Sequence, residues 1–188
     1  MKAWVWWTIG GVTGTVAAVA LIKRKEIMQA VWDILTEQRI QKLHPLVRDR
    51  ARKFIIEAHN QGINLRVVQG LRTWPEQQTI YDQGRTAASK AKGEKIVSWA
   101  KPGESPHNYG LAIDVVEMKN GSALWETPNW QKIGTIGKSF GFEWGGDWSK
   151  EKLDRPHFEY PPGVPASKWL ANYKAGMLDE KGYLTQIT

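Results

Sequence analysis

The segment that most constrains this chain runs from Ser105 to Val116, because its two halves favour different structures. Residues 108–110 read Asn-Tyr-Gly, which is typical of a turn, whereas residues 111–116 are apolar at every position except Asp114. A short apolar run of this kind predicts a buried strand. A carboxylate within it needs a partner, since an unpaired buried charge costs several kcal/mol. A metal ion is one partner that would satisfy it.

A second motif downstream offers further metal ligands. Residues 154–157 read Asp-Arg-Pro-His, and His107 lies seven residues before Asp114. Two histidines and one aspartate, with a fourth position left to water, form the ligand count of a catalytic zinc site, and the remaining acid is then free to act as a general base. A histidine near a strand is more often a structural residue. The residues alone therefore leave a metal site and a structural role both open.

Together the two motifs resemble those of the zinc peptidases that cut peptidoglycan stem peptides. That family includes D-alanyl-D-alanine carboxypeptidases and the L-alanyl-D-glutamate endopeptidases of phage endolysins and bacterial autolysins. The resemblance rests on Ser-x-His-x-x-Gly-x-Ala-x-Asp at 105–114, Gly-Phe-Glu-Trp-Gly-Gly-Asp-Trp at 141–148 and Asp-x-Pro-His-Phe-Glu at 154–159, and it extends from about Arg39 to about Tyr160. It implies an α+β fold in which helices flank a small antiparallel sheet, as in D,D-peptidases and hedgehog-type domains.

The same resemblance implies roles for the residues of the two motifs. His107, Asp114 and His157 are the expected zinc ligands, and Asp154 is the expected catalytic acid/base. Because side chains alternate along a strand, His157 and Glu159 are expected on one face, where Glu159 is a candidate partner of His157.

Further residues are expected to contact the substrate. Arg72 lies between a predicted strand at 65–68 and a helix that begins with a Thr73/Glu76 capping box, a kind of junction where side chains often reach a cleft. From the residues alone, a surface ion pair for Arg72 is equally open. The resemblance assigns three residues to the substrate site: Arg72, Gln77 and Ser105. A guanidinium suits the carboxylates of a stem peptide or a developing oxyanion.

Hydrophobic periodicity and turn residues predict the other elements. Helices are expected over residues 26–40, 45–59, 133–140 and 166–175. Short strands are expected at 95–98 and 157–159, and polar loops at 86–103 and 119–129. Ser105 and His107 are expected to point the same way along extended chain. His44 and His59 are interpreted as structural or surface residues, and Trp144 and Trp148 as core residues.

Residues 3–22 form an uncharged stretch of twenty positions, about the length that crosses a bilayer core. Three tryptophans in the first seven residues fit an interfacial aromatic belt. The stretch could be a permanent anchor, a signal peptide cleaved after Ala20, a segment like the signal-anchor-release segments of some phage endolysins, or a buried soluble helix. The basic residues 23–25 favour the cytoplasm by the positive-inside rule, whereas a peptidoglycan enzyme acts on the other side of the membrane.

Length and composition fit one catalytic domain with appendages. The expected units are a membrane anchor or signal segment at 1–25, a connector helix at 26–40, a zinc peptidase domain at 41–162 and a C-terminal helical extension at 163–188. The absence of cysteine excludes thiolate zinc sites and disulfide scaffolds. The net charge of +7 favours attraction to an anionic polymer such as cell wall, a membrane surface or nucleic acid.

The expected function is that of a zinc-dependent endopeptidase that cleaves the L-Ala–D-Glu bond of peptidoglycan, as a phage or prophage endolysin. A D,D-carboxypeptidase is the nearest alternative, but such family members tend to carry Glu-x-x-His where this chain has Asp154 before His157. A non-catalytic zinc-binding domain would be expected to lose the general base, and nucleic-acid binding has only the positive charge in its favour. We therefore expect no nucleic-acid partner. The expected protein is a monomer that binds peptidoglycan, is tethered to the bacterial inner membrane through residues 3–22, and acts in the periplasm or cell wall.

Overall fold

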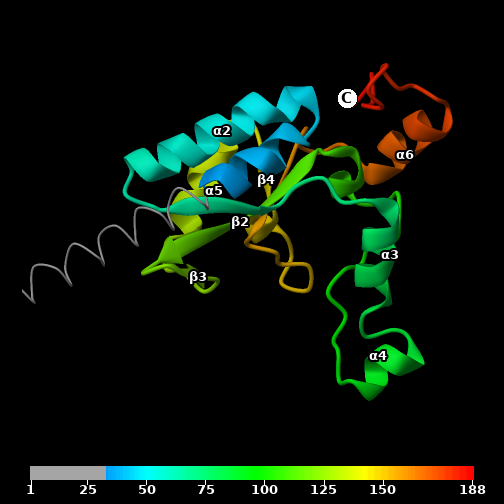
Figure 1. Ribbon diagram of the computed structural model, residues 1–188, viewed down its shortest axis with the longest axis horizontal. Helices are drawn as coiled ribbons and strands as arrows, with labels where there is room; N and C mark the ends of the chain where they lie inside the picture. The colour runs from blue at the N-terminus through cyan, green and yellow to red at the C-terminus, as the bar shows by residue number, and fades with distance from the viewer. Residues whose placement is uncertain (1–32) are drawn as a thin grey trace, which may run out of the picture.

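The computed structural model describes residues 33–188, and an antiparallel sheet lies at its centre (Figure 1). The strands follow the order β1 (Leu65–Gln69), β2 (Ala112–Lys119), β5 (His157–Glu159) and β4 (Glu143–Trp144), and β3 (Ser122–Leu124) pairs with the far end of β2. Every pairing is antiparallel. The α+β fold with a small antiparallel sheet is thus confirmed, although β3 lies in a segment expected to be a loop.

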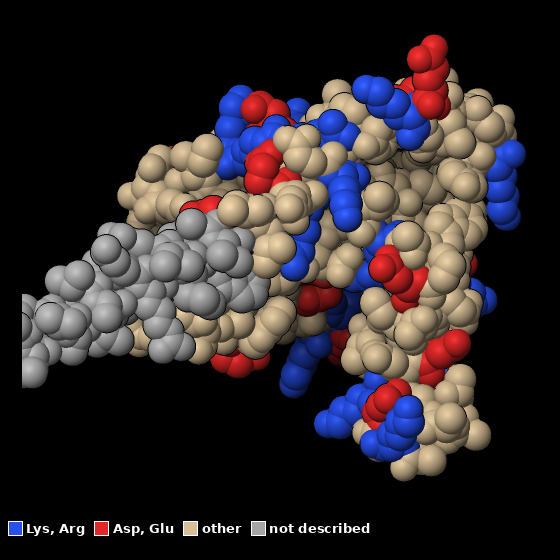
Figure 2. Space-filling model, in the orientation of Figure 1, with Lys and Arg blue, Asp and Glu red and all other residues tan. Residues whose placement is uncertain are grey.

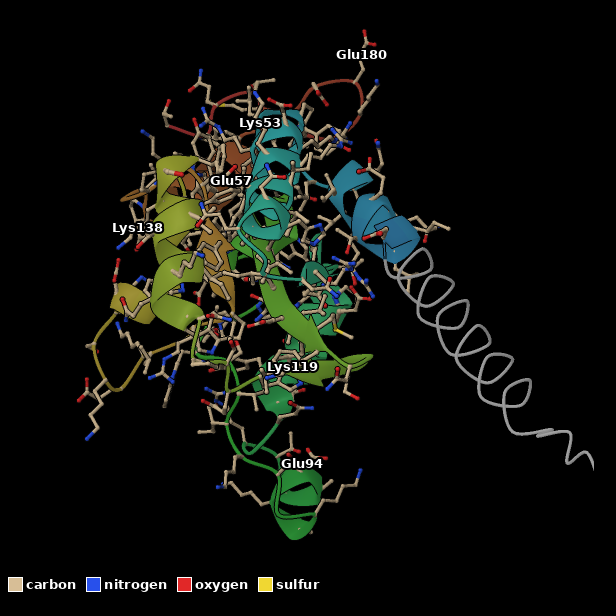
Figure 3. All side chains as sticks on the ribbon, turned by 90° about the vertical axis from the view of Figure 1, so that its left-hand side faces the viewer. Lys53, Glu57, Glu94, Lys119, Lys138 and Glu180 are labelled. Carbon is tan, nitrogen blue, oxygen red and sulfur yellow. The ribbon has the colours of Figure 1, made fainter. Side chains whose placement is uncertain are left out.

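Two helices cover one face of the sheet. They are α2 (Pro45–Asn60) and α5 (Trp130–Ser139), which pack on each other and on the strands. Phe54 of α2 is fully buried, and its ring centre lies 4.8 Å from that of Phe158 on β5. Lys53 and Lys138 lie on the outer sides of α2 and α5 (Figure 3). The apolar core therefore lies between these helices and the sheet.

Strand alternation leaves the opposite face of the sheet for polar residues. On β2, Ile113 and Val115 belong to the core cluster that contains Phe54. Successive side chains point to opposite faces of a strand, so Asp114 points away from that core. On β5 the same rule buries Phe158 and turns its two neighbours toward the face that holds Asp114.

The segment that joins β1 to β2 forms an arm that projects from the body (Figure 1). The arm carries α3 (Trp74–Asp82) and α4 (Ala87–Ala91), and the chain returns through residues 92–104 to the 3₁₀ turn η1 (Pro106–Tyr109). The Thr73/Glu76 capping box that starts α3 is present, as predicted. The strand predicted at 95–98 is wrong, because in the described structure this stretch pairs with no strand. Just after it, the carbonyl of Ala100 accepts a hydrogen bond from the side chain of Gln77, at 2.8 Å.

The C-terminal segment packs back onto the body. Helix α6 (Ala166–Lys174) buries Trp169, and the indole Nε1 donates to the carbonyl of Ile187 at 2.9 Å. Farther on, the carbonyl of Leu184 accepts from the imidazole of His44 at 2.9 Å, at the start of α2. Both Leu184 and Ile187 are buried in the core cluster. Residues 163–188, in which the sequence offered no motif after α6, thus contribute to the same core as the strands.

The expected membrane segment at 3–22 lies outside the described residues, as do residues 26–32 of the connector expected at 26–40. The described part of that connector, residues 33–40, is helical and continues to residue 41. Between residues 33 and 188, no helix is both long enough and apolar enough to span a bilayer.

Charged side chains are mixed on the face shown in Figure 2. Lysine and arginine atoms lie among aspartate and glutamate atoms there, and the described residues form no single basic patch on that face.

Candidate metal centre

The three predicted ligands, His107, Asp114 and His157, meet on the face of the sheet that α2 and α5 leave open. Asp114 on β2 is paired directly with His157 on β5, and His107 follows from the turn η1 just before β2. The imidazoles present His107 Nε2 and His157 Nδ1, which lie 3.2 Å from each other and 3.3 and 3.2 Å from Asp114 Oδ1. The antiparallel register therefore brings together Asp114 and His157, which are 43 positions apart.

These spacings fit a tetrahedral zinc ion. With bonds of 2.0–2.2 Å to nitrogen and oxygen, the ligand atoms of a tetrahedral zinc site lie about 3.3–3.6 Å from one another. The three separations in this site, 3.2, 3.2 and 3.3 Å, lie at the short end of that range. Two imidazoles and one carboxylate are also the donors of a catalytic zinc site, which keeps a fourth position open. The residues present therefore fit the ion that the motifs predict.

The far side of each imidazole is held by an acceptor. His107 Nδ1 donates to the carbonyl of Gly70 at 2.8 Å, and His157 Nε2 donates to Glu159 Oε2 at 2.9 Å. Such partners fix the orientation of a metal-binding histidine and raise its basicity. The expected placement of Glu159 beside His157 is thus what the structure has, and the other nitrogen of each ring faces Asp114.

The charges around the site favour a bound cation. Burial alone would lower the pKa of His157, but hydrogen bonds and charges from Asp114 and Glu159 outweigh it and raise that pKa to about 10. Burial also opposes ionisation of Asp114, yet His107 and His157 hold the pKa of its carboxyl well below its usual range. The two carboxylates thus create a potential that attracts positive charge, whether it comes as a proton or as a metal ion.

Asp154, the predicted catalytic acid/base, lines the same pocket as the three ligands. Solvent reaches its side chain through the pocket mouth, while the protein around it buries the carboxyl enough to raise its pKa, and the charge of Asp114 raises it further. Gly145 allows this placement: its carbonyl accepts from the amide of Asp154 at 3.0 Å, and a Cβ at Gly145 would lie 2.4 Å from the carbonyl of Asp154. A carboxyl with a raised pKa is suited to taking and returning a proton.

Of the three predicted substrate residues, Arg72 and Ser105 line the pocket and Gln77 lies beneath it. Arg72 Nη2 is 3.6 Å from Asp114 Oδ2, and Arg72 Nε is buried without a hydrogen-bond partner in the described structure. Gln77 is fully buried and accepts from Arg72 Nη1 at 2.9 Å. Ser105 precedes a 3₁₀ turn, so the extended chain expected between Ser105 and His107 is wrong, although both residues reach the pocket.

The pocket has a volume of about 940 Å³ and three kinds of wall. The metal group, which is His107, Asp114 and His157, forms one part of its lining together with Asp154. The arm forms another part with Ile80, Val97 and Trp99. The C-terminal segment contributes Val164, Pro165, Ala166 and Trp169. A cavity of this size accommodates far more than a single amino acid.

One aromatic residue of the site was interpreted wrongly from the sequence. Trp144 is a core residue as expected, but Trp148 is only half-buried, lines the pocket, and lies with its ring centre 5.1 Å from that of His157. Its indole Nε1 donates to Glu143 Oε1 at 2.7 Å. The Gly145-Gly146 pair before it marks a tight turn, and this was the available signal that the two tryptophans could take different directions.

The other two histidines have structural contacts. His44 caps the start of α2 and bonds the C-terminal segment, and His59 bonds the carbonyl of Leu65 at 3.0 Å. In the described part of the chain, the candidate metal group contains neither.

Comparison with known proteins places this site in a family. Residues 40–162 match the sequence model of VanY, described as D-alanyl-D-alanine carboxypeptidase. The peptidoglycan L-alanyl-D-glutamate endopeptidase CwlK of Bacillus subtilis (strain 168) is 42% identical over 130 residues, which are 64% of this chain and 74% of CwlK. The L-alanyl-D-glutamate peptidase of Listeria phage A118 is 27% identical over 124 residues, covering 64% of this chain and 39% of the phage protein.

A solved structure shares the fold. The vancomycin resistance D,D-pentapeptidase VanY from the VanB-type resistance cassette, in complex with Zn(II), superposes with a TM-score of 0.51 and 24% identity, covering 69% of this chain and 78% of that one. The family match spans the sheet, the arm and both motifs. Because it covers well over half of the chain, and CwlK is matched over about three quarters of its length, this chain belongs to the VanY family of D-alanyl-D-alanine carboxypeptidases.

Proposed function

We propose that this protein is a zinc-dependent endopeptidase that cleaves the L-Ala–D-Glu bond of peptidoglycan stem peptides. The observation that carries the proposal is the convergence of His107 Nε2, Asp114 Oδ1 and His157 Nδ1 within 3.2–3.3 Å of one another, beside Asp154 in one pocket. The choice of bond is supported by the 42% identity to CwlK, which is named for this cleavage.

In this proposal His107, Asp114 and His157 hold the zinc ion. A zinc ion bound by three protein ligands supplies a Lewis acid that activates water at neutral pH and polarises a carbonyl group. Gly70 and Glu159 keep the two imidazoles turned toward Asp114, through the hydrogen bonds on their far nitrogens. The chain thus pre-organises the donor atoms before substrate arrives.

Asp154 is the residue that moves protons. Burial and the charge of Asp114 raise the pKa of its carboxyl, so it accepts a proton from the attacking water more readily than an ordinary aspartate would. It then returns that proton to the amine that leaves from D-Glu. The hydrogen bond from the Asp154 amide to the Gly145 carbonyl anchors the backbone from which this carboxyl projects.

Arg72 is placed to bind negative charge. Its side chain lines the pocket, and Arg72 Nη2 lies 3.6 Å from Asp114 Oδ2, so the guanidinium charge stands beside the metal position. Donors aimed at a developing oxyanion stabilise the transition state more than the ground state. A substrate carboxylate would be bound by the same fork.

A D,D-carboxypeptidase is the second candidate, and the family match itself supports it. The two activities differ in product: an endopeptidase releases a peptide that begins with D-Glu, whereas a carboxypeptidase releases free D-Ala.

A lysis enzyme must also reach the cell wall. We propose that residues 3–22 tether the protein to the inner membrane before it acts on the wall.

The test is mass spectrometry of purified peptidoglycan digested with the full-length protein. We expect peptides with new amino termini at D-Glu. Removing zinc with a chelator should abolish these products, and adding back one equivalent of zinc should restore them. Release of D-Ala alone would replace the endopeptidase with the carboxypeptidase. Full activity in strong chelator would rule out the zinc mechanism.

A further inference from the structure

An exposed tryptophan stands on the arm at the edge of the pocket. Trp99 is 68% exposed and lines the pocket, and the neighbouring Val97 is 62% exposed and lines it too. Large apolar side chains gathered at a pocket edge mark a surface that binds something, since exposing them to water is unfavourable. The catalytic arrangement described above makes no use of either residue.

Hydrogen bonds from Gln77 hold the residues on both sides of Trp99. The fully buried side chain of Gln77 donates to Ser98 Oγ at 3.0 Å and to the carbonyl of Ala100 at 2.8 Å, which are the residues before and after Trp99. The same amide accepts from Arg72 Nη1 at 2.9 Å. Gln77 thus joins the tryptophan platform to the active site.

The ring itself is supported by the arm. The guanidinium carbon of Arg85 lies 5.6 Å from the ring centre of Trp99 and 3.9 Å from that of Tyr81. A cation at this distance from an aromatic ring is attracted to its face. The indole is therefore held in place while most of its surface stays open, which is the arrangement of a binding platform rather than of a core residue.

We propose that Trp99 binds the sugar of the peptidoglycan strand by stacking on a pyranose ring. The inference rests on the proposed L-Ala–D-Glu cleavage. In that substrate, one alanine and a lactyl linker separate the scissile bond from the muramyl sugar, on the order of 10 Å at 3.3–3.6 Å per residue. A sugar so close to the cut bond must lie in or at the pocket.

The chemistry of the two partners is complementary. A pyranose ring presents a face of C–H groups, and an exposed indole gains by covering such a face. The platform would thus select stem peptides that are still attached to the glycan over released peptides. A carboxypeptidase acting at the far end of the stem would have no sugar within this reach.

The test compares two soluble substrates with the same stem peptide, one carrying the disaccharide on L-Ala and the other an acetyl group. The full-length protein should cleave the disaccharide substrate with a kcat/KM on the order of tenfold higher. In Trp99→Ala this preference should fall to within about twofold, and Trp99→Phe should keep part of it. Trp125→Ala is the matched control, because Trp125 is 52% exposed and lies outside the pocket lining, and it should keep the full preference.

The outcomes separate the inference from the proposed function. Equal preference in the unmodified protein and Trp99→Ala, or no preference in the unmodified protein, would overturn the role of Trp99. Failure of the unmodified protein to cut either substrate at L-Ala–D-Glu would instead overturn the proposed function. In that case the affinity for the disaccharide substrate, measured by calorimetry, still tests the inference. Trp99→Ala should bind this substrate more weakly than Trp125→Ala does.

Discussion

At the scale of single residues, Asp114 connects the parts of the site. One carboxylate oxygen lies within 3.3 Å of both histidines, and the other lies 3.6 Å from Arg72. The two aspartates of the site therefore have different tasks: Asp114 contacts the histidines that face the metal position, whereas Asp154 stands at the open side of the pocket with a raised pKa.

This division predicts that two isosteric substitutions affect different properties, one the catalytic rate and the other zinc binding. Asp154→Asn should lower kcat by about a hundred- to ten-thousand-fold, because it removes the proton acceptor, while zinc still binds at one equivalent. Asp114→Asn should weaken zinc binding on the order of a hundredfold or more, because it removes a charged ligand. The measurements are the metal content after dialysis and the rate of stem-peptide cleavage.

Asp147→Asn is the control, since Asp147 is exposed and pairs with Lys138 at 2.6 Å on the surface. Asp147→Asn should change neither the zinc content nor the rate of stem-peptide cleavage. Loss of zinc from Asp154→Asn, with zinc retained by Asp114→Asn, would reverse the roles of the two acids.

His107, Asp114 and His157 could be singled out from the sequence because their motifs resemble those of a known family, and the structure brings their side chains together. The motif spacing also allowed Glu159 to be placed, since alternation along a strand needs no tertiary information. The positions of Gln77 and Trp148 could not be predicted in this way. Whether a side chain lies under a pocket or in its wall depends on how the arm and the 145–154 turn pack against the sheet.

At the scale of elements, the C-terminal segment is part of the body of the protein although it follows the family match. Trp169 of α6 is buried among strand and helix residues, donates to Ile187, and reaches the pocket lining. Trp169→Ala should lower the free energy of unfolding by about 3–5 kcal/mol, as for other buried large aromatic residues. Urea unfolding followed by circular dichroism would measure it.

The neighbouring Lys168 is exposed and serves as the control. Lys168→Ala should stay within about 0.5 kcal/mol of the unmodified protein. A loss below about 1 kcal/mol for Trp169→Ala would mean that residues 163–188 contribute little to the folded state.

Elements with a strong periodic pattern were predicted well. Helix α2 was expected at 45–59 and spans 45–60, because its buried residues recur at helical spacing. The arm was predicted poorly for a physical reason. The β-branched pair Ile96-Val97 within residues 95–98 favours a strand, yet a strand needs a neighbouring strand, and in the described structure none pairs there. The partner that replaces it is one buried side chain, Gln77, which no local pattern reveals.

At the scale of the whole molecule, the site residues and the proposed membrane segment lie far apart in the sequence. The metal group and its immediate partners lie between Gly70 and Glu159, and the family match begins at residue 40. The structure between residues 33 and 188 therefore contains a complete set of predicted catalytic groups. Catalysis and localisation can be tested separately.

We expect residues 3–22 to place the full-length chain in the membrane fraction. Twenty uncharged residues are about the length of a bilayer core, and tryptophans flank one end. A chain that begins at Glu26 should be recovered in the supernatant and should still cleave purified wall, because every predicted ligand and Asp154 are retained. Residues 1–25 fused to an unrelated soluble protein serve as the control and should carry that protein to the membrane. Full-length protein found in the supernatant, or a mature protein that begins after Ala20, would refute the tether, while loss of wall cleavage by the shorter chain would show that the first residues also serve the catalytic domain.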